Sequence, residues 1–359
     1  MVRIVAVNLS LVAAVLIAAE LLFGGWFGRE NWGTLVIPKN VERRFDVDDL
    51  YGGGTITFTR DRYGLRGAYD DPGRIDILTI GGSTTNEIFL DDGQTWSAVL
   101  AREFERAGKP MVVVNAGVDG QSTVGHLKNF ELWFPRIPNL KPRYVLAFIG
   151  INDTGRHLEI GRVESDRRSS SKQDRMLEAR RPWKQTLLNN SALYTLFRNI
   201  RGMLRARNAR LIHGTDSFDG STWKAPQTPP DIDATARRWS GRLAEYAARL
   251  KEFAKRIRAI GAEPIFATQH WPSYRIRDGR VLGYVDAKSG SVALPHYALL
   301  MAHNRVTMEV CEDIRGICIN LARDITFDDG DHYDGLHTSP RGSEKIGRYL
   351  HHRLAEVLK

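Results

Sequence analysis

Five short apolar runs recur between residues 75 and 321, and segments with a helical pattern separate them. The helical segments repeat apolar residues every three to four positions, as Trp96, Leu100 and Phe104 do. Near-continuous apolar strands that alternate with helices are typical of a parallel sheet covered on both faces. The apolar runs cover residues 75–80, 111–115, 144–149, 263–268 and 317–321.

The same pattern predicts one α/β domain over residues 75–359, built on a five-stranded parallel sheet. In an open parallel sheet, ligands bind beyond the carboxyl ends of the strands, so we expect the chemistry in the loops that follow the apolar runs. The predicted helices cover residues 95–107, 124–134, 232–260, 295–314 and 340–358.

Residues 1–27 predict a signal anchor that forms a transmembrane helix. The run from Ile4 to Phe23 is almost wholly apolar and has about the 20 residues that a helix needs to cross a bilayer. A cleaved signal peptide is the alternative, but the run is long for one and no small-x-small cleavage site follows it. Because Arg3 precedes the run, we expect a cytoplasmic N-terminus and an extracytoplasmic catalytic domain, periplasmic or at the cell surface.

Residues 28–74 predict an N-terminal extension that contains a β-hairpin. A glycine-rich turn at residues 52–54 precedes residues 55–60, TITFTR, where polar and apolar residues alternate as in a strand.

Residues 156–230 break the alternation of strands and helices and predict a basic helical insertion. Between Arg156 and His213 there are 14 Lys and Arg residues against 5 Asp and Glu, an excess equal to the formal charge of +9 of the whole chain. We expect a solvated surface extension, with a patch that contacts anionic lipid or an acidic polymer as the alternative. Nucleic acid is not expected as a partner on the far side of a membrane.

The two cysteines, Cys311 and Cys318, are too few for a disulfide framework, and no Cys or His spacing suggests a zinc site. We expect two buried thiols. A single bridge is the alternative, which an oxidising compartment would allow.

The first apolar run ends in Gly81 and Gly82, and Ser83 follows them. A phosphate-binding loop would need a longer glycine pattern with Lys-Ser/Thr, or GxGxxG, and neither is present. A plain turn and the seat of a nucleophile are the two interpretations left. A serine at a strand-to-helix turn suits a nucleophile because the helix side supplies backbone N–H donors for an oxyanion.

The loops after the second and third runs each offer a hydrogen-bond donor. Residues 115–123 contain Gly120, whose backbone N–H can approach a ligand without side-chain interference. Residues 150–155 contain Asn152, whose amide donates two hydrogen bonds. Taken singly, each pattern is also ordinary turn chemistry.

A loop near the C-terminus contains two Asp-x-x-His pairs, Asp329 with His332 and Asp334 with His337. The second pair is preferred because residues 338–340, Thr-Ser-Pro, predict a helix N-cap just after it. An aspartate three residues before a histidine can orient the ring toward a serine. A solvated acidic loop and a cation site are the alternatives. The cation site would use Asp328, Asp329, Asp331 and Asp334.

Together, the stretches TIGGSTT, NAGVDGQST, FIGIND and DGLHTSPRG resemble those of the SGNH (GDSL-type) hydrolase superfamily, in particular its membrane-anchored bacterial members. The resemblance implies a flavodoxin-like three-layer α/β/α fold. It implies Ser83 as nucleophile, His337 as general base and Asp334 as the residue that orients His337. It also implies an oxyanion hole formed by the backbone N–H groups of Ser83 and Gly120 and the side chain of Asn152. The family usually has Asp at the position of Gly82.

The activity implied is that of a serine esterase, or acyl hydrolase, acting on an extracytoplasmic ester such as an acylated carbohydrate or lipid. The resemblance implies no metal and no organic cofactor. An O-acyltransferase of surface polysaccharide that uses the same site is one alternative, and a non-enzymatic membrane-tethered scaffold is another. His270, after the fourth run, is a candidate substrate contact, although a structural histidine beside Trp271 also fits. Glu87 and Asp153 lie near the expected site without a defined role.

Overall fold

The computed structural model describes residues 2–24, 26, 37–154, 190–194, 196–197, 200 and 217–358. The chain divides into two compact units, Met1–Val36 with Ile160–His213, and Ile37–Glu159 with Gly214–Lys359. Most of the predicted basic insertion at 156–230 lies outside the described residues.

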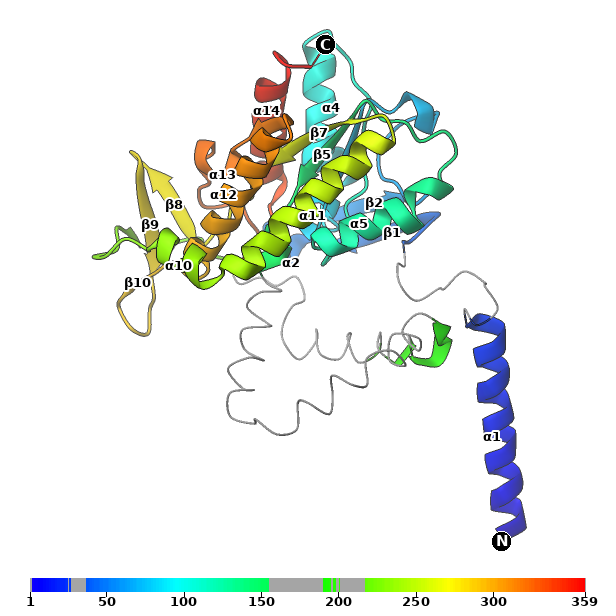
Figure 1. The fold of residues 1–359 in the computed structure, drawn as a ribbon. Coiled ribbons are helices and arrows are strands. Elements are labelled where there is room, and N and C mark those ends of the chain that lie inside the picture. The colour runs from blue at the N-terminus through cyan, green and yellow to red at the C-terminus, as the bar shows by residue number, and fades with distance from the viewer. Residues whose placement is uncertain are drawn as a thin grey trace. The chain divides into compact units, whose positions relative to one another are not determined.

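A five-stranded parallel sheet forms the centre of the second unit (Figure 1). Its strand order is β11-β7-β5-β3-β4. Counted along the chain, this is the order 2-1-3-4-5 of flavodoxin-like sheets, in which the order reverses between the first and third strands, here β3 and β5. The predicted α/β class and five-stranded parallel sheet are confirmed. The strands are β3 (Ile77–Gly81), β4 (Val113–Asn115), β5 (Tyr144–Phe148), β7 (Glu263–Ala267) and β11 (Ile317–Ile319).

Both faces of this sheet are covered by helices, because alternate residues of each strand point to opposite sides. In β7, Ile265 packs in one core cluster with Trp96 of α4 and Ile346 of α14. Its neighbour Phe266 instead stacks on Phe253 of α11, with 6.0 Å between ring centroids. α5 and α12 pack beside α11, so the unit has three layers (Figure 1). The covering helices are α4 (Trp96–Arg106), α5 (Thr123–Leu132), α11 (Ser240–Ala259), α12 (Tyr297–Asp313) and α14 (Pro340–Leu354).

The single helix predicted over residues 232–260 is two helices. α10 (Ile232–Arg238) is followed by Trp239, whose φ of −104° and ψ of 15° leave the helical region, and α11 begins at the next residue. The helix predicted to reach residue 358 ends at Leu354. Apolar periodicity continues across both points, which is why the sequence does not reveal the breaks.

The residues before the parallel sheet form an antiparallel hairpin, β1 (Val41–Asp46) with β2 (Thr55–Arg60), and the short helix α2 (Asp48–Tyr51) lies between its strands. This hairpin agrees with the strand predicted over residues 55–60. The division of the chain places it in the same compact unit as the sheet.

A second, small antiparallel sheet was not predicted. Its central pair, β8 (Tyr274–Arg277) and β9 (Arg280–Val285), turns at Asp278 and Gly279, which both have positive φ. An Asp-Gly pair between two strands is a strong hairpin signal, so this sheet was recognisable from the sequence. The other elements are β6 (Trp223–Lys224), β10 (Val292–Ala293), α3 (Ser83–Asn86), α13 (Leu321–Asp324), and the 3-10 turns Pro72–Arg74, Asp92–Gln94 and Phe134–Arg136.

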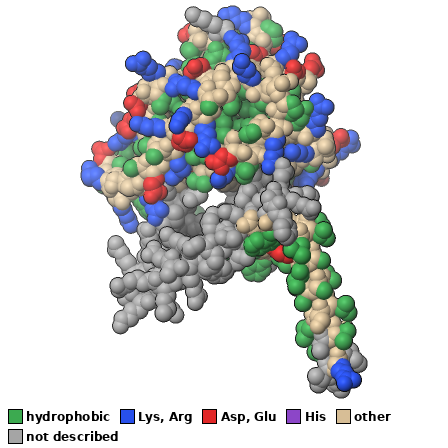
Figure 2. Space-filling model, turned by 45° about the vertical axis from the view of Figure 1, so that its right-hand side comes forward, with side chains coloured by type: hydrophobic (Ala, Val, Ile, Leu, Met, Phe, Trp, Pro, Cys, Tyr) green, Lys and Arg blue, Asp and Glu red, His purple; other side chains and the backbone are tan. Residues whose placement is uncertain are grey.

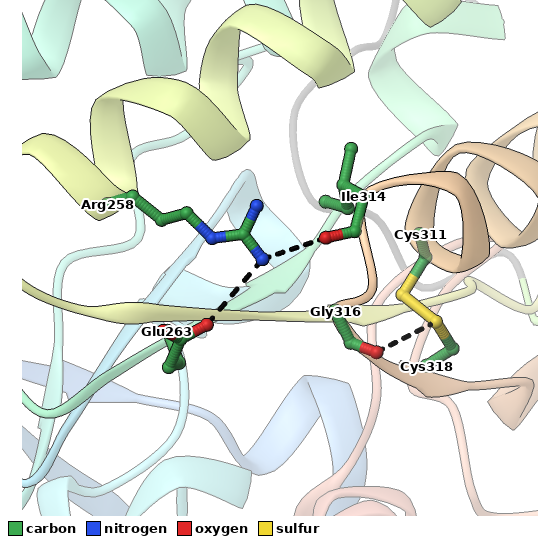
Figure 3. Close-up of a disulfide and its surroundings, with 6 residues drawn as sticks. All are labelled: Arg258, Glu263, Cys311, Ile314, Gly316 and Cys318. Carbon is green, nitrogen blue, oxygen red and sulfur yellow. Dashed lines mark hydrogen bonds and ion pairs between the residues drawn. A yellow bond between two sulfur atoms is a disulfide. The ribbon is translucent and has the colours of Figure 1, made fainter.

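Cys311 and Cys318 form a disulfide, so the expectation of two free thiols is wrong and the alternative of a single bridge is confirmed (Figure 3). The bridge joins the last turn of α12 to β11, and the Cα atoms of the two cysteines lie 5.8 Å apart. The intervening loop is also held by Arg258, which donates a hydrogen bond of 2.8 Å to the carbonyl of Ile314 and pairs with Glu263 at 3.6 Å. The disulfide and Arg258 therefore both hold the loop between α12 and β11 in place.

The first unit contains the helix α1 (Val2–Phe23), along which many apolar side chains are exposed (Figure 2). In the last turn of this helix, the carboxylate of Glu20 accepts hydrogen bonds from the indole of Trp26 (2.7 Å) and the backbone N–H of Leu193 (3.0 Å). Among the residues that the structure describes, no helix combines the length and apolarity needed to cross a membrane. The transmembrane helix predicted in residues 1–27 is therefore not found there.

Candidate active site

Ser83 lies at the tight turn between β3 and α3, at the carboxyl edge of the sheet. The turn requires glycine at residue 81, because a Cβ there would lie 2.0 Å from Thr85 Oγ1 and 2.7 Å from the carbonyl oxygen of Phe148. Ser83 is the first residue of α3, and 8% of its surface is exposed. The hydroxyl group is thus held on a short helical turn beside the point where the strand order reverses.

The structure brings Ser83, His337 and Asp334 together. Ser83 Oγ lies 2.9 Å from His337 Nε2, although the two residues are 254 positions apart in the sequence. His337 Nδ1 lies 2.8 Å from Asp334 Oδ2. If Nδ1 carries the proton, Asp334 accepts it in a hydrogen bond and Nε2 is left as an acceptor for the serine hydroxyl.

Asp334 also holds the backbone around His337. Its Oδ1 accepts hydrogen bonds from the N–H groups of Leu336 (2.8 Å) and His337 (2.6 Å). Burial alone would raise the pKa of Asp334, but the hydrogen bonds from His337 and from these backbone groups outweigh it and hold the pKa below its usual value. The carboxylate is therefore ionised at neutral pH and can stabilise an imidazolium on His337.

The other Asp-x-x-His pair lies apart from this arrangement. Asp329 forms an ion pair with Arg275. His332 is buried among aromatic rings, 4.9 Å from that of Phe327 and 6.0 Å from that of His270. Burial lowers the pKa of His332 to about 3, so its ring is neutral at physiological pH.

The aspartates considered as a cation site are paired with basic side chains. Asp328 contacts Arg277 at 3.0 Å, and Asp331 contacts Lys345 and Arg341. Within residues 37–154 and 217–358 and the other described positions, no group of three or more His, Cys, Asp or Glu side chains is arranged to hold a metal ion.

Asn152 lies directly against the turn that carries the serine. A Cβ on Gly82 would lie 2.2 Å from Asn152 Nδ2 and 3.3 Å from the carbonyl oxygen of Gln121. The Asn152 amide donates a hydrogen bond of 2.8 Å to that same carbonyl, which leaves its second N–H available. A side chain at residue 82 would therefore displace the Asn152 amide from its present position.

Gly120, the other expected donor, lies one residue before Gln121 in the loop after β4. Its φ of +71° favours glycine, and a Cβ there would meet nothing within 4 Å, so this residue faces open space. The segments that contain Ser83, Gly120 and Asn152 are therefore neighbours.

His270 is buried, and its ring packs against those of Tyr274 at 4.2 Å and Phe327 at 4.7 Å. Burial lowers its pKa well below the usual value. These contacts favour the structural interpretation, and the contact with substrate stays a prediction.

The preceding residue, Gln269, has a role that the sequence analysis missed. Its Oε1 accepts the backbone N–H of Ile151 at 2.7 Å, and its Nε2 donates to Thr84 Oγ1 at 2.8 Å. Gln269 therefore joins the turn that carries Ser83 to the turn that carries Asn152. Its position at the carboxyl end of β7 is the one signal in the sequence that points to the site.

Glu87 links the exit of α3 to the start of α14. Its buried carboxylate accepts hydrogen bonds from the backbone N–H of Trp96 (2.8 Å), from Thr338 Oγ1 (2.9 Å) and from Ser343 Oγ. Thr338 directly follows His337, so Glu87 connects the two segments that meet at the site. Burial raises the pKa of Glu87 to about 7, against the opposing effect of these hydrogen bonds.

Asp153 anchors the start of α5 next to the loop of Gly120. It accepts hydrogen bonds from the backbone N–H (3.0 Å) and the hydroxyl (2.7 Å) of Thr123, and Arg249 lies 3.4 Å from the same carboxylate. Like Glu87, Asp153 holds together segments that carry candidate site residues, here those of Asn152 and Gly120.

Comparison with known proteins identifies the family. The model of the GDSL-like lipase/acylhydrolase family matches residues 79–282, which is more than half of the 359-residue chain. No curated protein matches the chain.

The chain also matches several solved structures. TesA is 15% identical with a TM-score of 0.43, over 79% of this chain and 99% of its own. The esterase EstA from Pseudoalteromonas sp. is 13% identical with a TM-score of 0.43, over 79% and 98%. The acetylxylan esterase Axe2 from Geobacillus stearothermophilus is 13% identical with a TM-score of 0.41, over 79% and 94%.

The family match begins within β3, two residues before the Gly81–Gly82 turn that presents Ser83. Together with the parallel sheet, it shows that this chain belongs to the GDSL-like lipase/acylhydrolase family and is a serine hydrolase.

Proposed function

We propose that the protein is a serine esterase that cleaves an extracytoplasmic ester with Ser83 as nucleophile, His337 as general base and Asp334 as the residue that orients the base. The observation that carries this proposal is the continuous hydrogen-bonded line from Ser83 Oγ to His337 Nε2 (2.9 Å) and from His337 Nδ1 to Asp334 (2.8 Å). Nucleophile and base within hydrogen-bond distance, with the base oriented by a third group, are what nucleophilic catalysis requires.

In the first step, His337 Nε2 accepts the hydroxyl proton of Ser83 while Oγ bonds to the ester carbonyl carbon. The carbonyl oxygen becomes an oxyanion, and Asp334 stabilises the imidazolium. The bond to the alcohol oxygen then breaks, and His337 gives its proton to the leaving alcohol. Water, deprotonated by the same imidazole, then attacks the acyl carbon. The bond from this carbon to Ser83 Oγ breaks, His337 returns its proton to Oγ, and the carboxylic acid is released.

The oxyanion is proposed to be held by the backbone N–H groups of Ser83 and Gly120 and by the side chain of Asn152. The contact between Asn152 and Gly82 supports this role, since it places the amide against the residue that precedes Ser83. Loss of one such donor costs about 10²–10³ in kcat in enzymes of this kind.

The substrate class we propose is an O-acyl ester on an extracytoplasmic carbohydrate or lipid. The disulfide between Cys311 and Cys318 supports a location outside the cytoplasm, because such bridges persist in oxidising compartments. The exposed apolar side chains of α1 support attachment of the chain to a membrane. Rates on acetylated oligosaccharides and on long-chain lipid esters, measured side by side, distinguish the two kinds of substrate.

The test of the proposed nucleophile is Ser83→Ala, with the exposed serine variant Ser289→Ala as the matched control. Ser83→Ala is expected to abolish hydrolysis of p-nitrophenyl acetate and covalent labelling by a serine-reactive phosphonate, and Ser289→Ala is expected to change neither. Wild-type turnover by folded Ser83→Ala would exclude this mechanism.

A further inference from the structure

Two arginines of the N-terminal hairpin region are buried against the segment that follows Ser83. Arg60 ends β2 and is 4% exposed, and Arg66 lies six residues further along and is 2% exposed. Arginine is rarely buried unless its guanidinium is fully paired, so the partners of these two side chains show what the burial achieves.

Arg66 binds the end of the short helix that carries Ser83. Its Nη1 donates to the carbonyl oxygens of Asn86 (2.6 Å) and Glu87 (3.0 Å), and its Nη2 donates to that of Leu90 (2.5 Å). Its Nε pairs with Asp92 at 2.6 Å. The last carbonyl groups of a helix have no partner within the helix, and a cation there is favourable, so Arg66 completes this turn.

Arg60 connects the same helix to the loop of Gly120. Its Nη2 donates to Asn86 Oδ1 at 2.6 Å and to the carbonyl oxygen of Gly117. Asn86 in turn donates to Asp119 Oδ1 at 2.7 Å. One guanidinium group therefore fixes the nucleophile turn and the expected oxyanion loop relative to each other. Burial lowers the pKa of Arg60 to about 10, so the group stays charged at neutral pH.

We propose that Arg60 and Arg66 are positioning residues of the active site, through which the N-terminal hairpin holds the Ser83 turn and the Gly120 loop in their reactive arrangement. This rests on the proposed role of Ser83. The family match begins at residue 79, so the hairpin lies outside the part of the chain that the match covers.

The physical reason lies in the size of α3. It has four residues, which is too short to be stable as an isolated helix, so its position depends on contacts from other segments. The distance of 2.9 Å between Ser83 and His337 tolerates little movement. A misplacement of about 1 Å in such a site can cost about 10²-fold in rate.

The experiment compares Arg60→Met and Arg60→Lys with Arg62→Met, a matched control whose exposed arginine lies two residues away. For each full-length protein, kcat and KM on p-nitrophenyl acetate, the rate of phosphonate labelling of Ser83 and the thermal unfolding midpoint are measured. Arg60→Met is expected to lower kcat and the labelling rate together by about 10–100-fold, with KM within about twofold of wild type. Arg60→Lys should recover part of the loss, and Arg62→Met should match wild type.

A role confined to stability predicts a different outcome, in which folded Arg60→Met has a lower unfolding midpoint but wild-type kcat and labelling rate. That result would overturn the proposal. If Arg60→Met does not fold, Asn86→Ala removes the shared partner instead, and wild-type rates in both Asn86→Ala and Arg60→Lys would overturn it equally. Ser83→Ala, assayed in parallel, separates the two proposals, because an active Ser83→Ala rejects the nucleophile whatever the arginine variants do.

Discussion

At the scale of single residues, the close approach of Asn152 to Gly82 leaves no room for a side chain at residue 82. No side chain at residue 82 is compatible with the observed position of the Asn152 amide, since the added Cβ would lie 2.2 Å from Nδ2. A side chain at residue 82 would therefore force the Asn152 amide to move away from the turn that carries Ser83.

We predict that Gly82→Ala lowers kcat on p-nitrophenyl acetate by about 10²–10³-fold, because it displaces one proposed oxyanion donor. Asn152→Ala should give a similar loss, and the double variant should be little worse than either single one, since both changes remove the same interaction. Steady-state kinetics of the three variants measure this.

Gly93→Ala is a suitable control for that series, because a Cβ at residue 93 would only reach ordinary contact at 3.8 Å with Asp91. Its kcat should equal that of the wild type. Additive losses in the double variant would contradict the view that Gly82 acts through Asn152.

At the scale of elements, the four-residue helix α3 is held from several sides. Gln269 at the end of β7, Glu87 with its partners in α14 and the arginines of the hairpin region all contact it or the residues next to it. These contacts from several segments explain how a single helical turn can hold the proposed nucleophile, Ser83, in a defined position.

The ionisation of Glu87 is predicted to make stability depend on pH. Its pKa is raised from 4.5 to about 7 in the folded protein, so between these values the folded state holds a proton that the unfolded state has lost. The free energy of unfolding should therefore fall as pH rises through this window. The loss is on the order of 3 kcal/mol, at about 1.4 kcal/mol per pKa unit.

Urea unfolding of wild type and Glu87→Gln at pH 5 and pH 8 measures this effect. The difference in free energy of unfolding between the two pH values should be smaller in Glu87→Gln, whereas the exposed-residue control Glu309→Gln should keep the wild-type difference. Equal differences in all three proteins would show that Glu87 does not titrate in this window.

At the scale of the whole molecule, the disulfide and the apolar helix α1 lead to a joint prediction about location. We expect Cys311 and Cys318 of the full chain to resist alkylation in intact cells until a reductant is added, because an exported domain meets an oxidising compartment. A variant with Leu11→Lys and Val15→Lys, which places charges in the apolar run, should stay in the cytoplasm with both thiols reactive.

Mass spectrometry measures whether Cys311 and Cys318 are alkylated before and after the reductant is added. Val357→Lys, an exposed valine near the C-terminus, controls for the added charge and should behave as the wild type. Free thiols in the wild-type chain would contradict the proposed location.

The sequence by itself determined the architecture and the identity of the residues with reactive groups. Strand and helix periods are local patterns, so five parallel strands and their covering helices followed from them, apart from the break at Trp239 and the hairpin at Asp278. Because the carboxyl ends of parallel strands share one edge, Ser83 and Asn152 could be expected to meet there before any coordinates were known.

Only the tertiary structure decided how these groups are held. Gln269, Glu87, Arg60 and the pairing of Cys311 with Cys318 depend on which side chains meet across the fold. A hydrogen bond between segments far apart in the chain leaves no periodic pattern, and a buried arginine or glutamate has the same letter as an exposed one. Their roles therefore appear only once the strands, helices and hairpin have packed together.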